Sequence, residues 1–296
     1  MRNSFLLLLC LFCSVTLFAQ EKMYIHKLDK ISLGALITKT DSVYFSNDGT
    51  KAYFRIGGLL AEYAASEIDS ISFGANSSTI VVTYNGTSAS VLNPLAFEGV
   101  SVTVKGADVT VNSTSENTEI NYSLKGTTTD GMFKIYSASM FNLKLNGLKL
   151  SNSDGPAVNI QSKKKCNITL EAGTSNVLAD GATYATSTED QKSAFFSEGQ
   201  LDFDGSGSLT VRSNSAHAIC SDDYIHILGG TVTVTGAAKD GIHTNDYFKM
   251  SGGTLNVTSA GDGVECESGY ILISGGSITS LNNSVDAKGL VCDSTL

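Results

Sequence analysis

A repeat of about 22–26 residues in the C-terminal third of the chain constrains the fold more than any other feature. Apolar residues begin successive copies at Phe195, Ile219, Ile242, Val264 and Leu290, in steps of 24, 23, 22 and 26. Each complete copy holds three short runs in which apolar and polar residues alternate, which is the pattern of strands with one buried face. A unit of this length cannot bury its own apolar face, so successive copies must stack.

Three strands per unit, each pairing with its equivalent in the next unit, predict an all-β chain that forms a parallel β-helix. Paired glycines at Gly229-Gly230, Gly252-Gly253 and Gly275-Gly276 supply a sharp bend between the second and third strands. The alternative is a β-propeller, but its blades need four strands and roughly 40–45 residues. The repeat is too short for that fold.

An apolar run at the N-terminus predicts export. It extends from Phe5 to Phe18 behind Arg2, and Leu17-Phe18-Ala19 is a plausible cleavage motif. The run is too short to span a membrane and no second apolar span follows, so we expect a signal peptide at residues 1–19 and no membrane span. The expected location is secreted or at the cell surface.

Residues 20–77 differ in composition from the repeat region and contain two related copies of their own. Met23-Tyr-Ile-His leads to Asp41-Ser-Val-Tyr-Phe, and Ala52-Tyr-Phe-Arg leads to Asp69-Ser-Ile-Ser-Phe, at sequence offsets of 29 and 28. This pattern predicts a small duplicated β-module that acts as an adaptor. Nothing in it indicates chemistry.

Alternating runs resume near Ser78, so we expect the β-helix domain to cover residues 78–296. Leu296 falls where the second strand of its coil should begin. A solenoid normally caps its final coil against edge pairing. The sequence therefore predicts a domain that is truncated at its C-terminal end.

Stacking turns the repeat into columns of side chains about 4.8 Å apart. One predicted outward column comprises Glu198, Asp222, Asn245, Glu267 and Asp293. A second column, at the turn that closes each unit, comprises Asp240, Asp262 and Asp286. Like charges at that spacing repel by roughly 0.9 kcal/mol per pair even at the dielectric constant of water, so a counter-ion is expected.

Carboxylate and amide oxygens are hard ligands that favour Ca²⁺ over a transition metal. The sequence therefore predicts Ca²⁺ on this acidic face. The candidate ligands are Asp222, Asp240, Asn245, Asp262, Glu267 and Asp286. The alternative is a solvated acidic face whose charges aid solubility.

Tyr224, Tyr247 and Tyr270 recur exactly one coil apart along the sequence. An exposed column of aromatic rings would give sugar rings a flat apolar platform, whereas the alternative is a structural ladder tucked into a turn. His217, His243 and Glu265 lie beside the acidic columns and could hydrogen-bond sugar hydroxyls. The predicted carbohydrate-binding residues are Tyr224, Tyr247, Tyr270, His243 and Glu265.

Four cysteines follow the predicted signal peptide: Cys166, Cys220, Cys266 and Cys292. Cys266 and Cys292 share one position of neighbouring coils and are predicted to point inward. Side chains stacked in this way do not readily adopt the dihedral angle of a disulfide, so two free thiols are expected there. Cys166 and Cys220 have no matching partner position.

An ordered series of short motifs resembles a known family. It includes Tyr84-Asn-Gly-Thr-Ser-Ala, Gly126-Thr-Thr-Thr-Asp-Gly and Asp240-Gly-Ile-His-Thr-Asn-Asp-Tyr, and the likeness covers roughly residues 78–296. The family is the bacterial carbohydrate-binding β-helix family that is similar in fold to pectate lyases. The resemblance implies a right-handed β-helix that binds plant-type polysaccharide, such as polygalacturonate or a cellulose-type glucan, with Ca²⁺ and without lyase machinery. The adaptor resembles segments that precede surface modules in Gram-negative bacteria.

These observations favour a non-catalytic carbohydrate-binding protein over two alternatives. The formal charge of −9 argues against a nucleic-acid partner, which would need a basic face. A Ca²⁺-dependent polysaccharide lyase needs a positioned base. Arg55 and Arg212 lie away from the acidic columns, although Lys239 and Lys288 lie near them. The other alternative is a structural or adhesive solenoid.

Overall fold

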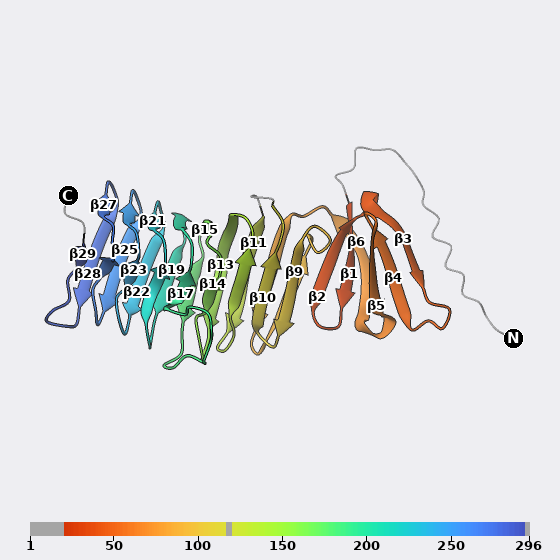
Figure 1. Ribbon diagram of the computed structural model, residues 1–296, viewed down its shortest axis with the longest axis horizontal. Coiled ribbons are helices and arrows are strands. Elements are labelled where there is room, and N and C mark those ends of the chain that lie inside the picture. The colour runs from red at the N-terminus through yellow and green to blue at the C-terminus, as the bar shows by residue number, and fades with distance from the viewer. Residues whose placement is uncertain (1–20, 117–119, 294–296) are drawn as a thin grey trace.

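The structure is a computed structural model that describes residues 21–116 and 120–293, and it is almost entirely β. It forms a β-solenoid of about eight turns, which confirms the parallel β-helix expected from the repeat (Figure 1). The predicted signal peptide lies outside the described residues. Within the described ranges, no helix is long and apolar enough to cross a membrane.

A nine-stranded sheet forms one face of the solenoid. From β10 onward its strands are parallel, and each comes from a successive coil. The strands are β9 (Val100–Lys105), β10 (Asp108–Ser113), β12 (Phe133–Ser137), β14 (Val158–Ile160), β17 (Ser193–Ser197), β20 (His217–Ser221), β23 (Ile242–Thr244), β26 (Val264–Cys266) and β29 (Leu290–Cys292).

A larger, 17-stranded sheet forms the rest of the coils and continues into the N-terminal module. Its solenoid strands are β7 (Thr79–Asn85), β8 (Ser88–Asn93), β11 (Asn121–Thr128), β13 (Phe141–Ser151), β15 (Cys166–Leu170), β16 (Ser175–Ala179), β18 (Leu201–Gly205), β19 (Ser208–Arg212), β21 (Ile225–Ile227), β22 (Thr231–Gly236), β24 (Phe248–Met250), β25 (Thr254–Ser259), β27 (Ile271–Ile273) and β28 (Ser277–Asn282).

The register of the parallel strands follows the repeat. Phe195, Ile219, Ile242 and Val264 lie opposite one another in successive coils, and all four are fully buried in the core. The next residue along each strand therefore points outward. Gly230, Gly253 and Gly276 adopt positive φ angles at the predicted bend, a conformation that glycine tolerates at little cost.

The N-terminal module repeats one sequence of elements twice and exchanges a strand between the copies. The first copy is β1 (Glu21–Lys27), β2 (Ile31–Leu36), the 3-10 helix η1 (Ile37–Lys39) and β3 (Thr40–Phe45). The second copy is β4 (Lys51–Ile56), β5 (Leu59–Ala64), the 3-10 helix η2 (Ala65–Glu67) and β6 (Ile68–Ala75). Strand β3 pairs with β4 of the second copy, and β6 pairs with β1 of the first.

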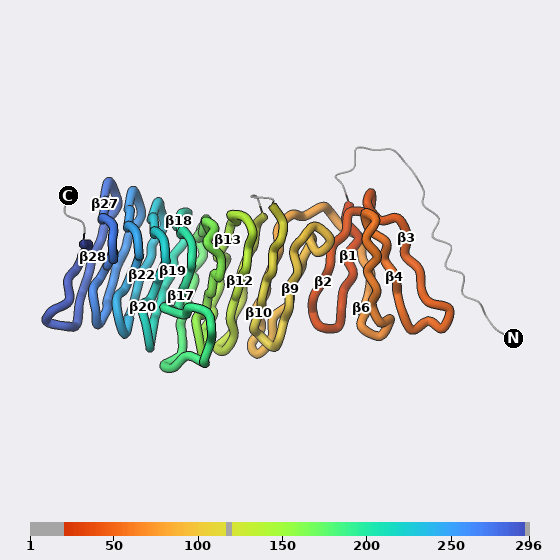
Figure 2. Tube along the Cα trace, in the orientation of Figure 1, coloured from red at the N-terminus to blue at the C-terminus, as the bar shows by residue number. Residues whose placement is uncertain are grey.

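The module and the solenoid are joined edge to edge, because β2 pairs in parallel with β8. The path of the tube in Figure 2 shows the module stacked at one end of the solenoid. A small separate core fills the module and includes Met23, Ile25, Phe54 and Ile56. The boundaries at residues 20–77 and 78–296 stay predictions.

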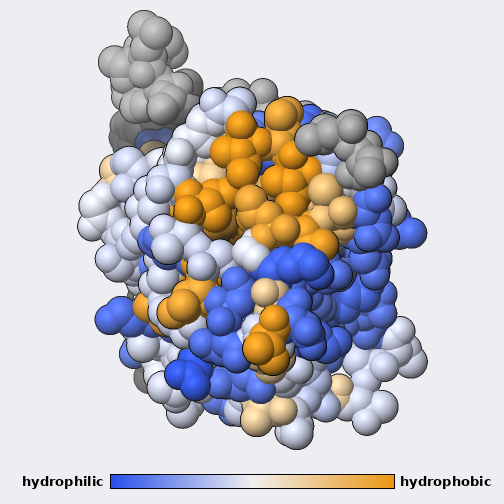
Figure 3. Space-filling model, turned by 90° about the vertical axis from the view of Figure 1, so that its left-hand side faces the viewer, coloured by the Kyte–Doolittle hydropathy of each residue, from blue (hydrophilic) through white to orange (hydrophobic). Residues whose placement is uncertain are grey.

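The other end of the solenoid presents apolar side chains to solvent, and Figure 3 shows them gathered on that face. Leu272, Ile273, Leu281 and Leu290 are 40–61% exposed there. Cys266 and Cys292 lie opposite each other near this end, and no disulfide joins them, as the sequence predicted for this pair. Cys166 and Cys220 form no disulfide either.

Candidate functional site

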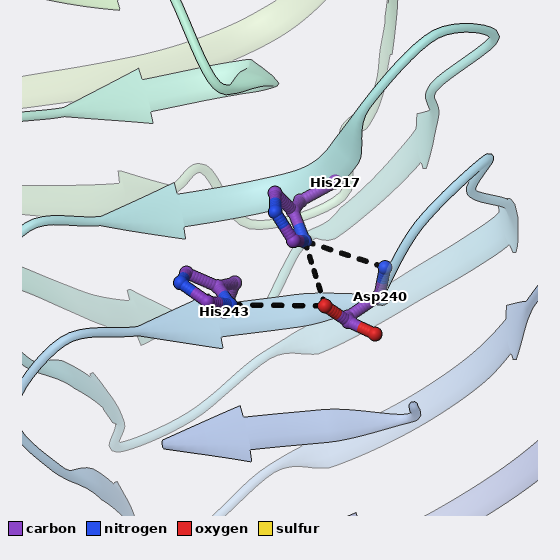
Figure 4. Close-up of side chains that lie close together, drawn as sticks. All are labelled: His217, Asp240 and His243. Atoms are coloured by element: carbon purple, nitrogen blue, oxygen red, sulfur yellow. Dashed lines mark hydrogen bonds and ion pairs between the residues drawn. The ribbon is translucent and has the colours of Figure 1, made fainter. Parts of the chain in front are cut away.

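His217, Asp240 and His243 form a buried cluster on the outer side of the nine-stranded sheet (Figure 4). His217 Nδ1 lies 2.9 Å from Asp240 Oδ2, and His243 Nδ1 lies 3.7 Å from the same oxygen. Glu265 Oε2 lies 2.9 Å from the same nitrogen of His243. The exposed fraction of each residue of the central trio is 8 or 9%.

Coil register places these side chains together. His243 and Glu265 occupy equivalent outward positions of β23 and β26, directly opposite each other. His217 begins β20 in the preceding coil, and its ring lies beside that of His243, with centroids 4.3 Å apart and planes tilted by 30°. Asp240 belongs to the turn before β23, so the turn delivers the carboxylate and the strands deliver the imidazoles.

The aspartates of the closing turns accept backbone hydrogen bonds from the following coil. Asp240 Oδ1 accepts from the Asp262 amide at 2.6 Å, and Asp262 Oδ1 accepts from the Lys288 amide at 2.5 Å. An earlier turn uses Asp180 in the same way, accepting from the Asn214 amide at 2.5 Å. These aspartates are therefore stabilised by peptide dipoles. Stacked repulsion in this column does not by itself require a metal ion.

The electrostatics of the cluster favour one ionised carboxylate. Burial raises the pKa of Asp240, but hydrogen bonds from His217 and His243 outweigh this effect and hold it well below its usual range. Burial lowers the pKa of His243, yet its hydrogen bonds with Asp240 and Glu265 leave it raised overall. Burial dominates at His217 and lowers its pKa. Burial and the neighbouring Asp240 charge raise the pKa of Glu265.

A polar hollow of about 440 Å³ opens over the two imidazoles. This volume lies within the range of about 300–1,000 Å³ that is usual for ligand sites. Its lining comprises Tyr184, Gln191, Lys192, Ser215, Ala216, His217, Lys239, His243, Asn245 and Glu267. The hollow therefore brings three predicted site residues, His243, Asn245 and Glu267, to one surface.

One wall of the hollow is a loop that sequence reasoning did not assign to the site. Residues 180–192 join β16 to β17 and project from the solenoid (Figure 1). They contribute Tyr184, Gln191 and Lys192 to the lining. The one available signal was the unusual length of this insertion between two alternating runs.

Two predicted metal ligands lie apart from the Asp240 cluster. Asp222 forms a salt bridge with Lys192 at 2.6 Å. Burial lowers the pKa of Lys192, but the hydrogen bond and charge of Asp222 outweigh this effect and raise it overall. Asp286 is exposed and belongs to none of the ligating groups that the described residues form. The structure thus joins two predicted metal ligands, Asp240 and Asp262, with Glu265, which was predicted to bind carbohydrate.

The donor set at Asp240 does not fit Ca²⁺, which takes six to eight oxygen ligands. Asp240 Oδ2 faces two imidazole nitrogens, and backbone amides already occupy Asp240 Oδ1 and Asp262 Oδ1. Ca²⁺ at Asp222, Asn245, Glu267 and Asp286 stays a prediction.

The three tyrosines stack along the solenoid axis. The ring centroids of Tyr224 and Tyr247 are 4.6 Å apart, those of Tyr247 and Tyr270 are 5.1 Å apart, and the planes differ by 11° and 10°. Lys249 Nζ lies 4.4 Å from the Tyr247 centroid. Because both faces of Tyr247 meet neighbouring tyrosines, this ring can present only its edge and hydroxyl group to a ligand. None of the three tyrosines lines the hollow.

The fold and the hollow together define a β-solenoid with a hollow lined mainly by polar side chains on the outside of its coils. A family described as "Carbohydrate-binding domain-containing protein" matches residues 105–293. This match covers more than half of the chain, which belongs to that family.

Two individual proteins are similar to this chain. A carbohydrate-binding domain-containing protein of Acetivibrio thermocellus is 30% identical over 114 residues, which are 37% of this chain and 40% of that protein. The match thus spans less than half of the relative's length. A solved structure, a gadolinium derivative of the polysaccharide lyase-like protein from C. thermocellum, aligns with a TM-score of 0.62. It is 24% identical and covers 74% of this chain and 96% of that chain, which shows a shared fold.

Proposed function

We propose that the hollow beside β20, β23 and β26 binds carbohydrate without chemically changing it. The observation that carries this proposal is the convergence of hydrogen-bonding side chains from three coils and a loop on one polar hollow. Membership of a carbohydrate-binding family supports it.

The lining suits sugar hydroxyl groups. Asn245 offers both a donor and an acceptor, and the Glu267 carboxylate accepts from two directions. Both follow strands of rigid coils, so they are held in place before a ligand arrives, which lowers the entropic cost of binding. Gln191 adds a second amide from the opposite wall.

We further propose that an acidic polysaccharide such as polygalacturonate binds better than a neutral, cellulose-type glucan. Lys239 lines the hollow, and its ammonium group is a cation at neutral pH. A uronate carboxylate could pair with it. The apolar run from Phe5 to Phe18 supports export to the place where such polymers occur.

A retention experiment tests this function. Asn245→Ala should weaken retention on polygalacturonate by about 2–10-fold, because it removes a neutral hydrogen bond, and Glu267→Ala by about 10-fold or more, because it removes one to a charged group. Glu171→Gln is the matched control, since its surface pair with Lys144 lies away from the hollow. Unchanged retention in the double variant would show that the hollow is not the site. The same retention measurement with and without a chelator tests whether binding needs the predicted Ca²⁺.

A polysaccharide lyase is the competing function, and the presence of Lys239 in the hollow favours it. A lyase would remove a proton beside the uronate carboxylate and generate unsaturated ends that absorb light. We expect retention without new absorbance. If products form, their loss in Lys239→Ala or Lys288→Ala, with binding intact, would establish the lyase.

A further inference from the structure

We propose that His217, Asp240 and His243 bind a divalent transition-metal ion of the Zn²⁺ class. Asp240 is also one of the predicted Ca²⁺ ligands, but the two imidazole nitrogens beside it suit a transition-metal ion, and this site does not depend on carbohydrate binding. The three residues offer two imidazole nitrogens and one carboxylate oxygen, all within 4.8 Å of one another. Two nitrogens and one carboxylate, with an open fourth position, form a common Zn²⁺ ligand set.

The separations match the size of such an ion. Bonds of about 2.0–2.1 Å to Zn²⁺ place tetrahedral ligands about 3.3 Å apart. Asp240 Oδ2 lies 2.9 Å from His217 Nδ1 and 3.7 Å from His243 Nδ1, values on either side of that spacing. Small movements of the side chains would therefore bring the oxygen into tetrahedral relation with both nitrogens.

His217 Nδ1 lies between two partners that need it in different protonation states, and a cation would satisfy one of these contacts. This nitrogen lies 3.3 Å from the backbone amide of Asp240, which can only donate, and 2.9 Å from Asp240 Oδ2, which can only accept when ionised. One ring nitrogen cannot serve both partners, since it either carries a proton or offers a lone pair. A metal ion between the nitrogen and the carboxylate oxygen would take one lone pair from each and so remove the need for a proton between them, while the Asp240 amide would lose this nitrogen as an acceptor.

The residues around His217, Asp240 and His243 supply a further ligand and a path for the ion from solvent. Glu265 Oε2, 2.9 Å from His243 Nδ1, lies close enough to complete the coordination as a fourth ligand. The hollow gives an ion a path from solvent, because both imidazoles line it. The rings now differ by 30° and must rotate about χ2 to converge on one ion, which is a soft torsion for histidine.

Titration of the tag-free full chain with Co²⁺, Zn²⁺ and Ca²⁺ tests the site. We expect one equivalent of Co²⁺ to bind with the intense visible absorption of tetrahedral coordination, and one equivalent of Zn²⁺ to displace it. Ca²⁺ should not displace the Co²⁺. In the proton NMR spectrum of the wild-type complex, ring protons of two histidines should show large paramagnetic shifts.

Variants identify the ligands. His217→Ala and His243→Gln should each abolish stoichiometric Co²⁺ binding, and Glu265→Gln should weaken it by about 10–100-fold. His226→Ala is the matched control, because His226 bonds Ser251 on a different sheet and its loss should change nothing. Absence of any tetrahedral spectrum in the wild-type chain would overturn the proposal, as would Co²⁺ binding that persists unchanged in a folded His243→Gln variant. The NMR shifts need no variant, so a misfolded one leaves the test decisive.

Discussion

Removing the carboxylate of Glu189 should open the loop that walls the hollow. Glu189 Oε2 pairs with Lys134 Nζ at 2.8 Å, and Glu189 Oε1 accepts a hydrogen bond from the Tyr136 hydroxyl. Both partners lie on β12, 55 and 53 residues away along the chain. These two bonds tie the loop of residues 180–192 to the outer side of the nine-stranded sheet.

The expected magnitude follows from partial burial. A hydrogen bond to a charged group contributes about 1.5–3 kcal/mol, but the Lys134 and Glu189 side chains are 15% and 27% exposed, so solvent screens the pair. We expect Glu189→Ala to reduce the free energy that favours the closed loop by about 1–2 kcal/mol. This change would raise the population of the open loop by about 5–30-fold. Glu189→Gln keeps an acceptor for the Tyr136 hydroxyl, so its effect on loop closure should lie between those of the wild type and Glu189→Ala.

The same contact predicts a dependence on pH. Burial raises the pKa of Glu189, but its bonds with Lys134 and Tyr136 outweigh this effect and lower it overall from 4.5. A carboxyl whose pKa is lowered by folding contributes stability above its unfolded value and loses that contribution as the pH falls below it. Loop closure should therefore weaken as the pH falls below about 4.5 in the wild type, and much less in Glu189→Gln.

Hydrogen exchange at the Ala185 amide measures loop opening, because this amide donates to the Asp154 carbonyl at 2.7 Å. Its exchange should accelerate by about 5–30-fold in Glu189→Ala, while Glu171→Gln should leave it unchanged. Equal exchange rates in the wild type and Glu189→Ala would refute the reasoning, since other contacts would then hold the loop.

Three further changes test the solenoid that carries the site. Phe203→Ala should lower the free energy of unfolding by about 3–5 kcal/mol in urea titrations, because the fully buried ring packs edge-on against Phe195. Gly205→Ala should lower the thermal midpoint, since the residue has a φ of +106° and a Cβ would meet the Leu170 carbonyl oxygen at 2.2 Å; an unchanged midpoint would contradict this account. Asn142→Ala should cost about 1–2 kcal/mol in urea titrations, because its amide links the two neighbouring asparagines of its column.

The sequence was sufficient to predict the coil and its register. The period of the repeat determines which strands pair. The alternation of apolar and polar residues along each strand determines which side chains point outward. For this reason the repeat alone places His243 and Glu265 on one face, as the strand register confirms. Burial drives both features, since a one-residue slip would expose every core side chain.

The sequence could not predict the partners of the turn aspartates. Asp240 looked like one of a stack of repelling charges, but it accepts from the Asp262 amide in the next coil. That bond depends on the conformation of two turns, and residue type alone does not fix it. The loop of residues 180–192 was missed for a related reason: its ties reach β12 and break the coil-to-coil rule that made the rest predictable.

The tyrosine column shows where a repeat stops being informative. A spacing of one coil fixes that Tyr224, Tyr247 and Tyr270 are axial neighbours, but ring orientation depends on side-chain torsions that the spacing does not encode. Rings 4.6 and 5.1 Å apart and nearly parallel turn both faces of Tyr247 toward other tyrosines. A sugar stacks on the face of an aromatic ring, so the middle of this column can offer a ligand only edges and its hydroxyl group. The geometry therefore favours a structural ladder, and recognition by hydrogen bonding belongs to the hollow around His243.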